Sequence, residues 1–503
     1  MYRNIDLIFH LRLSPDGKRL KHSVESPYGE HQQELDFNLP EIPFRDRWPW
    51  QVPEDDRVKK FGAAVFEMLF PGALYSTFLR GLDDLYSNGQ LRLMIDAPEP
   101  RVAFVPWELA YDPRRQEFIA LDPRIPVVRL VQTPDTVHKI SPSEQLQILV
   151  ALPSPADLAQ LDLEREKQML LQALEIPVQS GKIELTFLER PVTLDKLHQA
   201  LSHQEYDILH LSGHGVIDST EKRSLLLIED DNSKSDALTP EKFATLVRGS
   251  GLKLISLMAM GSAAYADVHD FQSTAASLVH AGVPAVVGLQ GGVMDESAIR
   301  FVRTFYASIA DGMEMERALT EARRTIHFTT QTTIEWAIPV LYSAAGLQET
   351  ALFLPYQINV EQRTGTVVGN IGGGSITGES VGINVSQTVS NVDIGGQIKG
   401  IRIGDFLGSK VDLDEVSEPA EPLVSAEEIR GLIGSLKKAV SAEPSLSPRE
   451  RIKGMSRVEA LRFAVSGDSV DHEQVLNLLT EISDVGPKPA EILTDVRKRL
   501  ASE

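Results

Sequence analysis

Between residues 145 and 345, short runs of apolar residues alternate with segments in which apolar residues recur at helical spacing. Four of the six runs contain at most one polar residue, so the strands they form would be buried on both faces. Such strands belong to a parallel sheet that helices cover on both sides. The pattern therefore predicts an α/β domain. The runs lie at 148–152, 183–188, 206–211, 225–228, 254–258 and 285–289.

The size and charge of the chain limit what else it can be. With 503 residues the chain is too long for a single core, so several domains are expected. Its formal net charge of −21 argues against nucleic acid and anionic membranes as partners. No apolar run reaches the roughly 18 residues that span a bilayer, and the first residues lack the features of a signal peptide. A cytoplasmic protein without a membrane partner is expected.

Changes in composition divide the chain into five parts. Residues 1–140 mix short strands and helices and are expected to form an α+β region that packs on the core at 145–350. Residues 364–404 are rich in glycine, and residues 405–423 form an acidic stretch typical of a hinge. Residues 424–503 have helical spacing throughout and predict a small helical domain.

Two structures fit the glycine-rich segment. Eleven of residues 364–404 are glycine, and apolar residues recur between them at every second position. Such a segment forms a flexible linker, because glycine-rich strands specify register poorly, or it forms β-structure that pairs between chains. The second alternative would make the protein a homo-oligomer.

Two glycine-containing motifs follow two of the predicted strands. The first contains His214 and Gly215, and the second contains Met260 and Gly261. Ligands and catalytic groups gather at the carboxyl ends of parallel strands, so the two motifs would meet if their strands are neighbours. His214 could then act as a base while the amides of Gly215 and Gly261 bind an oxyanion or a peptide. A capped turn with a half-buried histidine is the plainer explanation of the first motif taken alone.

Seven motifs between residues 60 and 345 add a more specific signal, because they follow one another in a fixed order. They are Val105-Pro-Trp-Glu-Leu109, Leu149-Val-Ala-Leu-Pro-Ser-Pro155, Asp207-Ile-Leu-His-Leu-Ser-Gly-His-Gly215, Leu278-Val-His-Ala-Gly-Val-Pro-Ala-Val-Val-Gly288, Phe301-Val-Arg-Thr-Phe-Tyr306, Ala318-Leu-Thr-Glu-Ala-Arg-Arg324 and Trp336-Ala-Ile-Pro-Val-Leu-Tyr342. In this order the motifs resemble the CHAT family, the caspase-like cysteine peptidases of clan CD found in bacteria. The resemblance implies a caspase-like sheet, and His214 matches the family's catalytic histidine.

The position of the family's nucleophile departs from the pattern. That cysteine falls in a strand-end motif written Leu-x-Ala-Cys, which here reads Leu257-Met-Ala-Met260. A thioether has no proton to lose, so Met260 cannot be the nucleophile of a peptidase. The chain contains no cysteine at all, which also excludes disulfides and thiolate metal sites. Ser262 lies two residues further on, displaced from the position that the inherited base would serve, so a cap of a turn or helix is favoured over a relocated nucleophile.

The remaining histidines and glycines predict no metal and no cofactor. His269 and His280 have no third ligand at metal spacing. Residues 369–374 resemble a phosphate-binding loop only in glycine content, because they lack the Lys-Ser/Thr pair that holds phosphate and magnesium.

Two other groups of residues are expected to serve the structure. Trp107 and Glu108 should pack and form hydrogen bonds in the N-terminal region. The pair Arg323 and Arg324 could hold a carboxylate, although arginines at a helix end more often bind carbonyl groups.

These observations favour a non-catalytic CHAT-like pseudopeptidase, a scaffold or regulator that binds a protein or peptide partner in a bacterial stress or defence pathway. The family resemblance implies the pathway, and the methionine at position 260 implies that the protein is not a catalyst. One alternative is an active caspase-like peptidase, either through Ser262 or because Met260 is an engineered replacement of cysteine. Another alternative is a structural protein that assembles through residues 364–404.

Overall fold

The computed structural model divides the chain into two units. The first unit contains Met1–Phe353 and Leu423–Glu503, and the second contains Leu354–Pro422. The described residues are 4–38, 55–86, 89–133, 140–158, 163–218, 223–259, 273–293, 295–330, 333–347, 349–353, 369–371, 374–376, 436, 439, 440 and 458. Met260, Gly261, Ser262 and His269 therefore lie outside the described residues.

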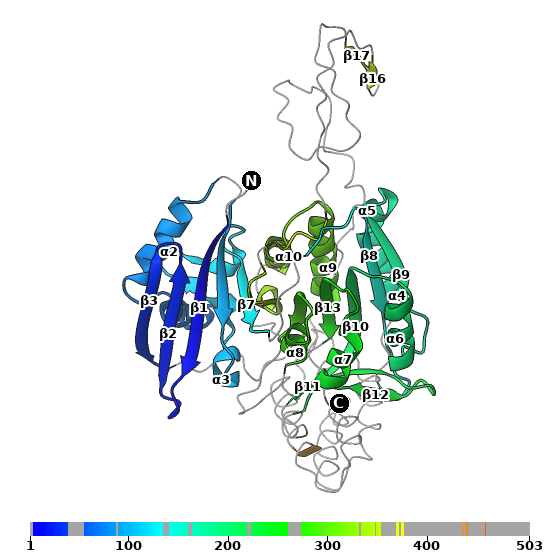
Figure 1. Ribbon diagram of the computed structural model, residues 1–503, viewed down its shortest axis with the longest axis horizontal. Coiled ribbons are helices and arrows are strands. Elements are labelled where there is room, and N and C mark those ends of the chain that lie inside the picture. Colours follow the sequence, from blue (N-terminus) through cyan, green and yellow to red (C-terminus); the bar gives the residue numbers. More distant parts are fainter. Residues whose placement is uncertain are drawn as a thin grey trace, which may run out of the picture. The chain divides into compact units, whose positions relative to one another are not determined.

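A single sheet of thirteen strands runs through the first unit (Figure 1). Its strands follow the order β12-β11-β10-β13-β14-β15-β7-β4-β1-β2-β3, and β8 pairs with both β10 and β9. The strands are β1 (Ile5–Leu13), β2 (Arg19–Ser26), β3 (Gly29–Asp36), β4 (Leu91–Asp96), β7 (Val127–Val131), β8 (Leu146–Ala151), β9 (Ile183–Phe187), β10 (Ile208–Asp218), β11 (Arg223–Glu229), β12 (Ser235–Leu238), β13 (Leu254–Ala259), β14 (Ala285–Leu289) and β15 (Pro339–Ala344). A separate short pair is formed by β5 (Tyr111–Asp112) and β6 (Glu117–Phe118).

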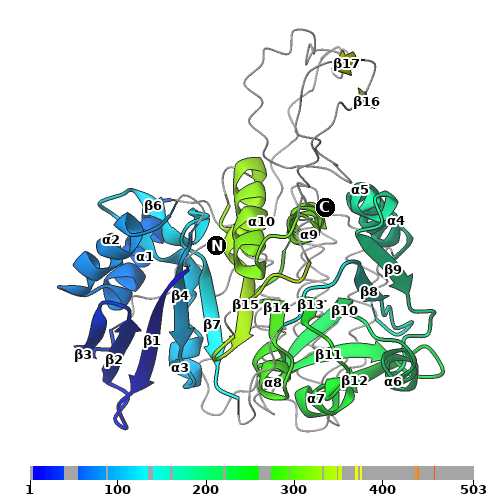
Figure 2. The same cartoon turned by 45° about the horizontal axis from the view of Figure 1, so that its top comes forward.

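The sheet contains two blocks of parallel strands. Strands β9, β8, β10, β13 and β14 are parallel to their neighbours, and so are β15, β7, β4 and β1. The blocks run in opposite directions because β14 and β15 are antiparallel. The predicted α/β fold is therefore confirmed. Strands from the N-terminal region join the same sheet, since β7 pairs with β15 in the register Tyr342↔Arg129 (Figure 2).

Ten α-helices and three 3₁₀ turns are described around the sheet. The helices are α1 (Asp56–Leu69), α2 (Leu74–Asp83), α3 (Pro100–Ala103), α4 (Leu163–Ala173), α5 (Glu175–Gln179), α6 (Leu194–His203), α7 (Pro240–Val247), α8 (Thr274–His280), α9 (Asp295–Ala310) and α10 (Met315–Thr330). The 3₁₀ turns are Trp107–Leu109, Ile119–Leu121 and Glu335–Ala337. Two helix starts follow their sequence signals, because Thr193 accepts a hydrogen bond from the amide of Lys196 and Thr239 from that of Lys242.

The first two helices are separated as Pro71-Gly72 predicts. Helix α1 ends before this pair and α2 begins after it, and Gly72 has a φ of +59°, which a residue with a side chain rarely adopts. Among the described helices, none is by itself long and apolar enough to cross a membrane, whereas α1 and α2, bent by 92°, pass that test as a pair. Most apolar residues of the pair, including Phe61, Val65 and Phe78, are buried in the protein core, whereas Leu79 is 38% exposed.

Helices cover both faces of the sheet, and the strands alternate between two cores. In β10, Ile208 packs in the core beneath α4, α9 and α10, while Leu209 and Leu211 pack beneath α6, α7 and α8. In β13, Met258 belongs to the first core and Leu257 to the second. This alternation places side chains of even number in β10 and β13 on the α9 face.

One predicted boundary in this region is wrong. The sequence pattern ends the strand near residue 211 and places His214 in a loop, but β10 continues to Asp218. Its second half pairs antiparallel with β11, in the register His214↔Leu227. This strand extension depends on pairing with β11, and the residues from Ser212 to Gly215 are not apolar, so hydrophobic periodicity did not indicate it.

The second unit contains one described pair of strands. Strands β16 (Gly369–Ile371) and β17 (Gly374–Ile376) are antiparallel to one another. The rest of the glycine-rich segment 364–404 and the predicted hinge at 405–423 lie outside the described residues. So does most of the predicted helical domain at 424–503, in which residues 436, 439, 440 and 458 are described as helical.

Candidate functional site

Strands β10 and β13 are neighbours, as a shared site for the two glycine-containing motifs requires. They are parallel, with Ser212 opposite Met258 and Gly213 opposite Ala259. His214 follows Gly213 in the sequence, and Met260 follows Ala259. The structure therefore brings the residues that precede His214 and Met260 to the same level of the sheet, at the carboxyl end of β13.

His214 and Gly215 lie within β10 rather than in a loop. The side chain of His214 is half-buried, and Gly215 is buried opposite Leu226 of β11. A strand holds both residues more rigidly than a loop would, because the pairing with β11 fixes their backbone. The roles of the His214 imidazole as a base and of the Gly215 amide as a donor stay predictions.

Gly213, the residue before His214, lies where a side chain would have no room. A Cβ atom at this position would lie 2.9 Å from Cγ of Pro153 and 3.3 Å from its carbonyl oxygen. Pro153 belongs to the segment that follows β8, so the absence of a side chain lets this segment cross close to β10. Gly213 therefore serves close packing at the site rather than an unusual backbone conformation.

A buried polar pair lies beneath the site on the α9 side. Nδ1 of His210 and the hydroxyl of Tyr306 are 2.9 Å apart, and both residues are buried. Burial lowers the pKa of His210 to about 4, so the ring is neutral at pH 7. Ser256, opposite His210 in β13, is also fully buried, which makes it a core residue rather than a nucleophile.

A carboxylate that the sequence did not single out fixes the loops beside the site. Glu229 ends β11 and is fully buried. Its carboxylate accepts hydrogen bonds from Nη2 of Arg190 at 2.6 Å and from the amide of Val192 at 2.6 Å. The same nitrogen of Arg190 donates to the carbonyl of Ser154 at 2.6 Å. Glu229 thus joins the segments after β8, β9 and β11, and its only sequence signal is a charged residue at the end of an apolar run.

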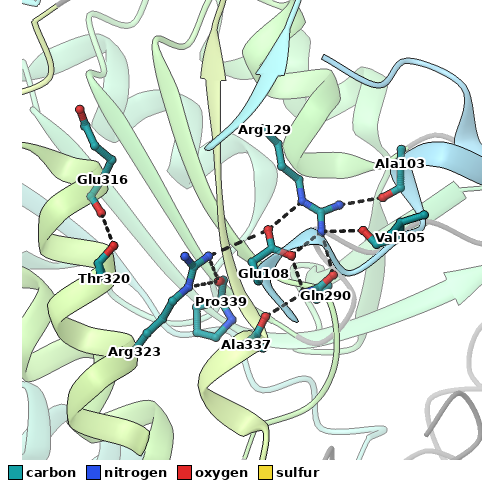
Figure 3. A network of polar contacts seen from close by, with 10 residues as sticks. All are labelled: Ala103, Val105, Glu108, Arg129, Gln290, Glu316, Thr320, Arg323, Ala337 and Pro339. Carbon is teal, nitrogen blue, oxygen red and sulfur yellow. Dashed lines mark hydrogen bonds and ion pairs between the residues drawn. The ribbon is translucent and has the colours of Figure 1, made fainter. Parts of the chain in front are cut away.

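A second buried network joins the N-terminal region to the end of β14 (Figure 3). The carboxylate of Glu108 is completely buried and accepts hydrogen bonds from Nε of Arg129 at 3.0 Å and from its Nη2 at 2.7 Å. Gln290, directly after β14, donates to Glu108 at 3.2 Å and to the carbonyl of Ala337 at 2.8 Å. Burial would raise the pKa of Glu108, but Arg129, with Arg323 beyond it, holds that pKa below its ordinary value. The predicted hydrogen-bonding role of Glu108 is confirmed.

Arg323 lies in the interior of α10, not at its end as the sequence suggested. Its guanidinium donates to the carbonyl of Pro339 through Nε at 3.2 Å and Nη2 at 2.8 Å, and Nη2 is 4.0 Å from Glu108 (Figure 3). Burial lowers the pKa of Arg323 to about 10. Arg323 therefore binds both a carbonyl and a carboxylate, and the carbonyl belongs to β15 instead of its own helix.

The other predicted residues are placed as follows. Arg324 pairs with Glu321 at 2.8 Å on the partly exposed side of α10. His280, the last residue of α8, is exposed and donates from Nδ1 to the carbonyl of Gln132 at 3.1 Å. No group of three or more His, Asp or Glu side chains suited to a metal ion occurs in the part of the chain that the structure describes.

Three solved structures with similar folds are each less than 15% identical to this chain. Saccharomyces cerevisiae separase, solved with securin, is 14% identical over 54% of this chain and 17% of its own, with a TM-score of 0.34. Gingipain R, an Arg-specific cysteine proteinase, is 10% identical over 60% of this chain and 74% of its own, with a TM-score of 0.38. The Drosophila initiator caspase Dronc is 8% identical over 44% and 95%, with a TM-score of 0.28.

Likenesses of this size carry no conclusion about activity or substrate. The chain spans less than a third of separase, 17% in one structure and 30% in a second. No curated protein matches the chain. The CHAT domain family, however, matches residues 67–344, which is more than half of the chain and includes both glycine-containing motifs. The protein therefore belongs to the CHAT domain family, as the seven ordered motifs predicted.

Proposed function

We propose that this protein is a non-catalytic CHAT protein that binds an extended peptide or a partner loop where β13 ends beside Gly213 of β10. It would act as a scaffold or regulator in a bacterial stress or defence pathway, as the family resemblance implies. The observation that carries the proposal is the register Gly213↔Ala259, combined with a methionine directly after Ala259.

Chemistry at this position argues against catalysis. The imidazole of His214 can activate a thiol or hydroxyl group, but Met260 offers neither. The described serine nearest in sequence, Ser256, is fully buried within β13. Ser212, opposite Met258 in β10, is buried as well, and its hydroxyl donates to the carbonyl of Met258 at 3.4 Å. Cleavage would therefore need a nucleophile other than these two described serines.

Binding needs less than catalysis and is compatible with the residues present. Backbone amides at a strand end still donate hydrogen bonds to an extended chain when no nucleophile is beside them. The edge is also held firmly, since Glu229 ties Arg190 and Val192 together and Pro153 packs on Gly213. A rigidly held site suits recognition of a peptide backbone.

The absence of cysteine allows a direct test. The variant Met260→Cys would carry a single thiol, whose alkylation by iodoacetamide can be followed against pH. If His214 lies beside position 260, the imidazolium should lower the pKa of the thiol at least one unit below its ordinary value of about 8.5. Adding His214→Ala should bring the midpoint back to about 8.5.

Met313→Cys is a matched control, because it places the single thiol on a half-buried residue far along the sequence from His214. Its alkylation should not respond to His214→Ala. An equal midpoint for Met260→Cys with and without His214 would refute the shared site. Cleavage of denatured casein by the unchanged chain would refute the non-catalytic proposal and favour the alternative of an active peptidase.

A further inference from the structure

A second binding place lies away from the β10–β13 edge. A pocket of about 560 Å³ opens between α3 with the ends of β4 and β7 on one side, and α7 with α8 on the other. Figure 2 shows α3 and α8 on either side of β7 and β15. None of its described lining residues comes from β10 or β13. Its volume falls within the roughly 300–1,000 Å³ typical of small-molecule sites.

The floor and walls of the pocket are largely apolar. Trp107 and Leu130 contribute the larger apolar side chains, and the wall formed by α7 and α8 carries small residues, Ala244 and Ala276 among them. Small side chains at these positions leave the room that the pocket occupies. Such a lining suits the hydrocarbon body of a ligand.

Most charged side chains of the lining already have a partner of opposite charge. Asp96 is buried and accepts a hydrogen bond from Nη2 of Arg12 at 2.6 Å. Arg129 forms an ion pair with Glu108 at 2.7 Å. Glu241 lies 3.8 Å from Arg223. These carboxylates therefore do not give the pocket a free negative charge.

Arg248 is different, because it makes no ion pair or hydrogen bond through its side chain with any described residue. It is exposed and follows the last turn of α7. The hydroxyl group of Ser277 adds a donor to the same lining, whereas that of Thr245 already donates to the carbonyl of Glu241 at 2.9 Å. The lining thus combines apolar walls with one guanidinium that has no partner of opposite charge. Such a group attracts a single negative charge.

We propose that this pocket binds a small molecule that has an apolar body and one carboxylate, with the carboxylate on Arg248. A monoanion fits better than a phosphate, because only one cation of the described lining lacks a partner. This proposal is independent of the peptide-binding function proposed for the β10–β13 edge.

Hexanoate and its uncharged analogue hexanamide test the proposal as a matched pair of probes. Binding to the full chain would be measured by saturation-transfer NMR and calorimetric titration. We expect hexanoate to bind at least about fivefold more tightly than hexanamide, since only the acid can pair with Arg248. Arg248→Gln should remove this difference. Arg303→Gln, which changes an exposed arginine of α9, should preserve it.

Filling the pocket provides the second arm of the test. Ala276→Trp places an indole in the pocket from α8, and Ala244→Trp does so from α7, so one variant can replace the other if either fails to fold. Both should abolish hexanoate binding while the circular dichroism spectrum stays unchanged. The proposal is overturned if hexanoate does not bind, if hexanamide binds equally well, or if binding survives in a folded pocket-filling variant.

Discussion

Nδ1 of His210 in β10 lies 2.9 Å from the hydroxyl oxygen of Tyr306 in α9, and both side chains are completely buried. This bond is a polar link between α9 and β10, the strand that also carries His214. Burying either partner alone would leave a polar atom without a hydrogen bond, so the two residues depend on each other.

Removing the hydroxyl should therefore destabilise the first unit. Tyr306→Phe leaves the His210 nitrogen buried without this partner, and we expect a loss of about 1–3 kcal/mol in the free energy of unfolding. Urea unfolding, followed by the fluorescence of buried Trp107 and Trp336, measures it. Tyr86→Phe is the control, because Tyr86 is 65% exposed and its change should cost less than about 0.5 kcal/mol. Equal effects of the two changes would contradict this role of the bond.

The same histidine should make stability depend on pH. The folded-state pKa of His210 is about 4, below the ordinary histidine value of 6.5. Between these values the unfolded chain binds the proton more readily, so stability falls as pH falls from 6.5 to 4. The contribution amounts to about 3 kcal/mol at the acid end. The free energy of unfolding, measured at several pH values, should depend less on pH in His210→Gln than in the unchanged chain. An equal dependence in the two proteins would contradict the assignment.

Gly213 should not tolerate a side chain. In Gly213→Ala the new Cβ would lie 2.9 Å from Cγ of Pro153, so the segment after β8 must shift. We expect a loss of about 1–3 kcal/mol in stability from overpacking. The double variant Gly213→Ala with Pro153→Ala should recover part of this loss, since it removes the ring that the methyl group meets. Additive losses in the double variant would show that the contact is not the cause.

Glu108 should contribute far more to the free energy of unfolding than an exposed glutamate does. Glu108→Gln leaves Arg129 and Arg323 buried without a carboxylate, which should cost about 3–5 kcal/mol. Glu321→Gln, which removes a partly exposed pair with Arg324, should cost less than about 1 kcal/mol. Urea unfolding of both variants decides the comparison. Similar values would mean that the buried network does not hold the N-terminal region to β14 and β15.

The glycine-rich segment offers a test of self-assembly. Strands β16 and β17 show that part of residues 364–404 pairs as β-structure, which is the property that assembly between chains would need. If this segment drives assembly, deleting residues 364–404 should reduce the sedimentation coefficient of the protein to that of a monomer. The same deletion should leave the pH profile of Met260→Cys alkylation unchanged. An unaltered particle size would exclude assembly through this segment.

The sequence by itself determined several features of the protein. Nearly uninterrupted apolar runs predicted the buried strands of an α/β fold, because periodicity is local and needs no knowledge of partners. Thr193, Thr239 and the Pro71-Gly72 pair marked helix boundaries for the same reason. Met260 excluded a thiol nucleophile at its position, since that conclusion follows from the chemistry of one side chain.

Only the tertiary structure decided what depends on partners outside the local segment. It extended β10 through His214 by pairing it with β11, and it joined the N-terminal strands to the sheet through β7 and β15. It also placed Arg323 beside Glu108, more than two hundred residues away in sequence. Strand order and buried ion pairs arise from long-range contacts, and the energy of such contacts leaves no periodic pattern in the sequence around either partner.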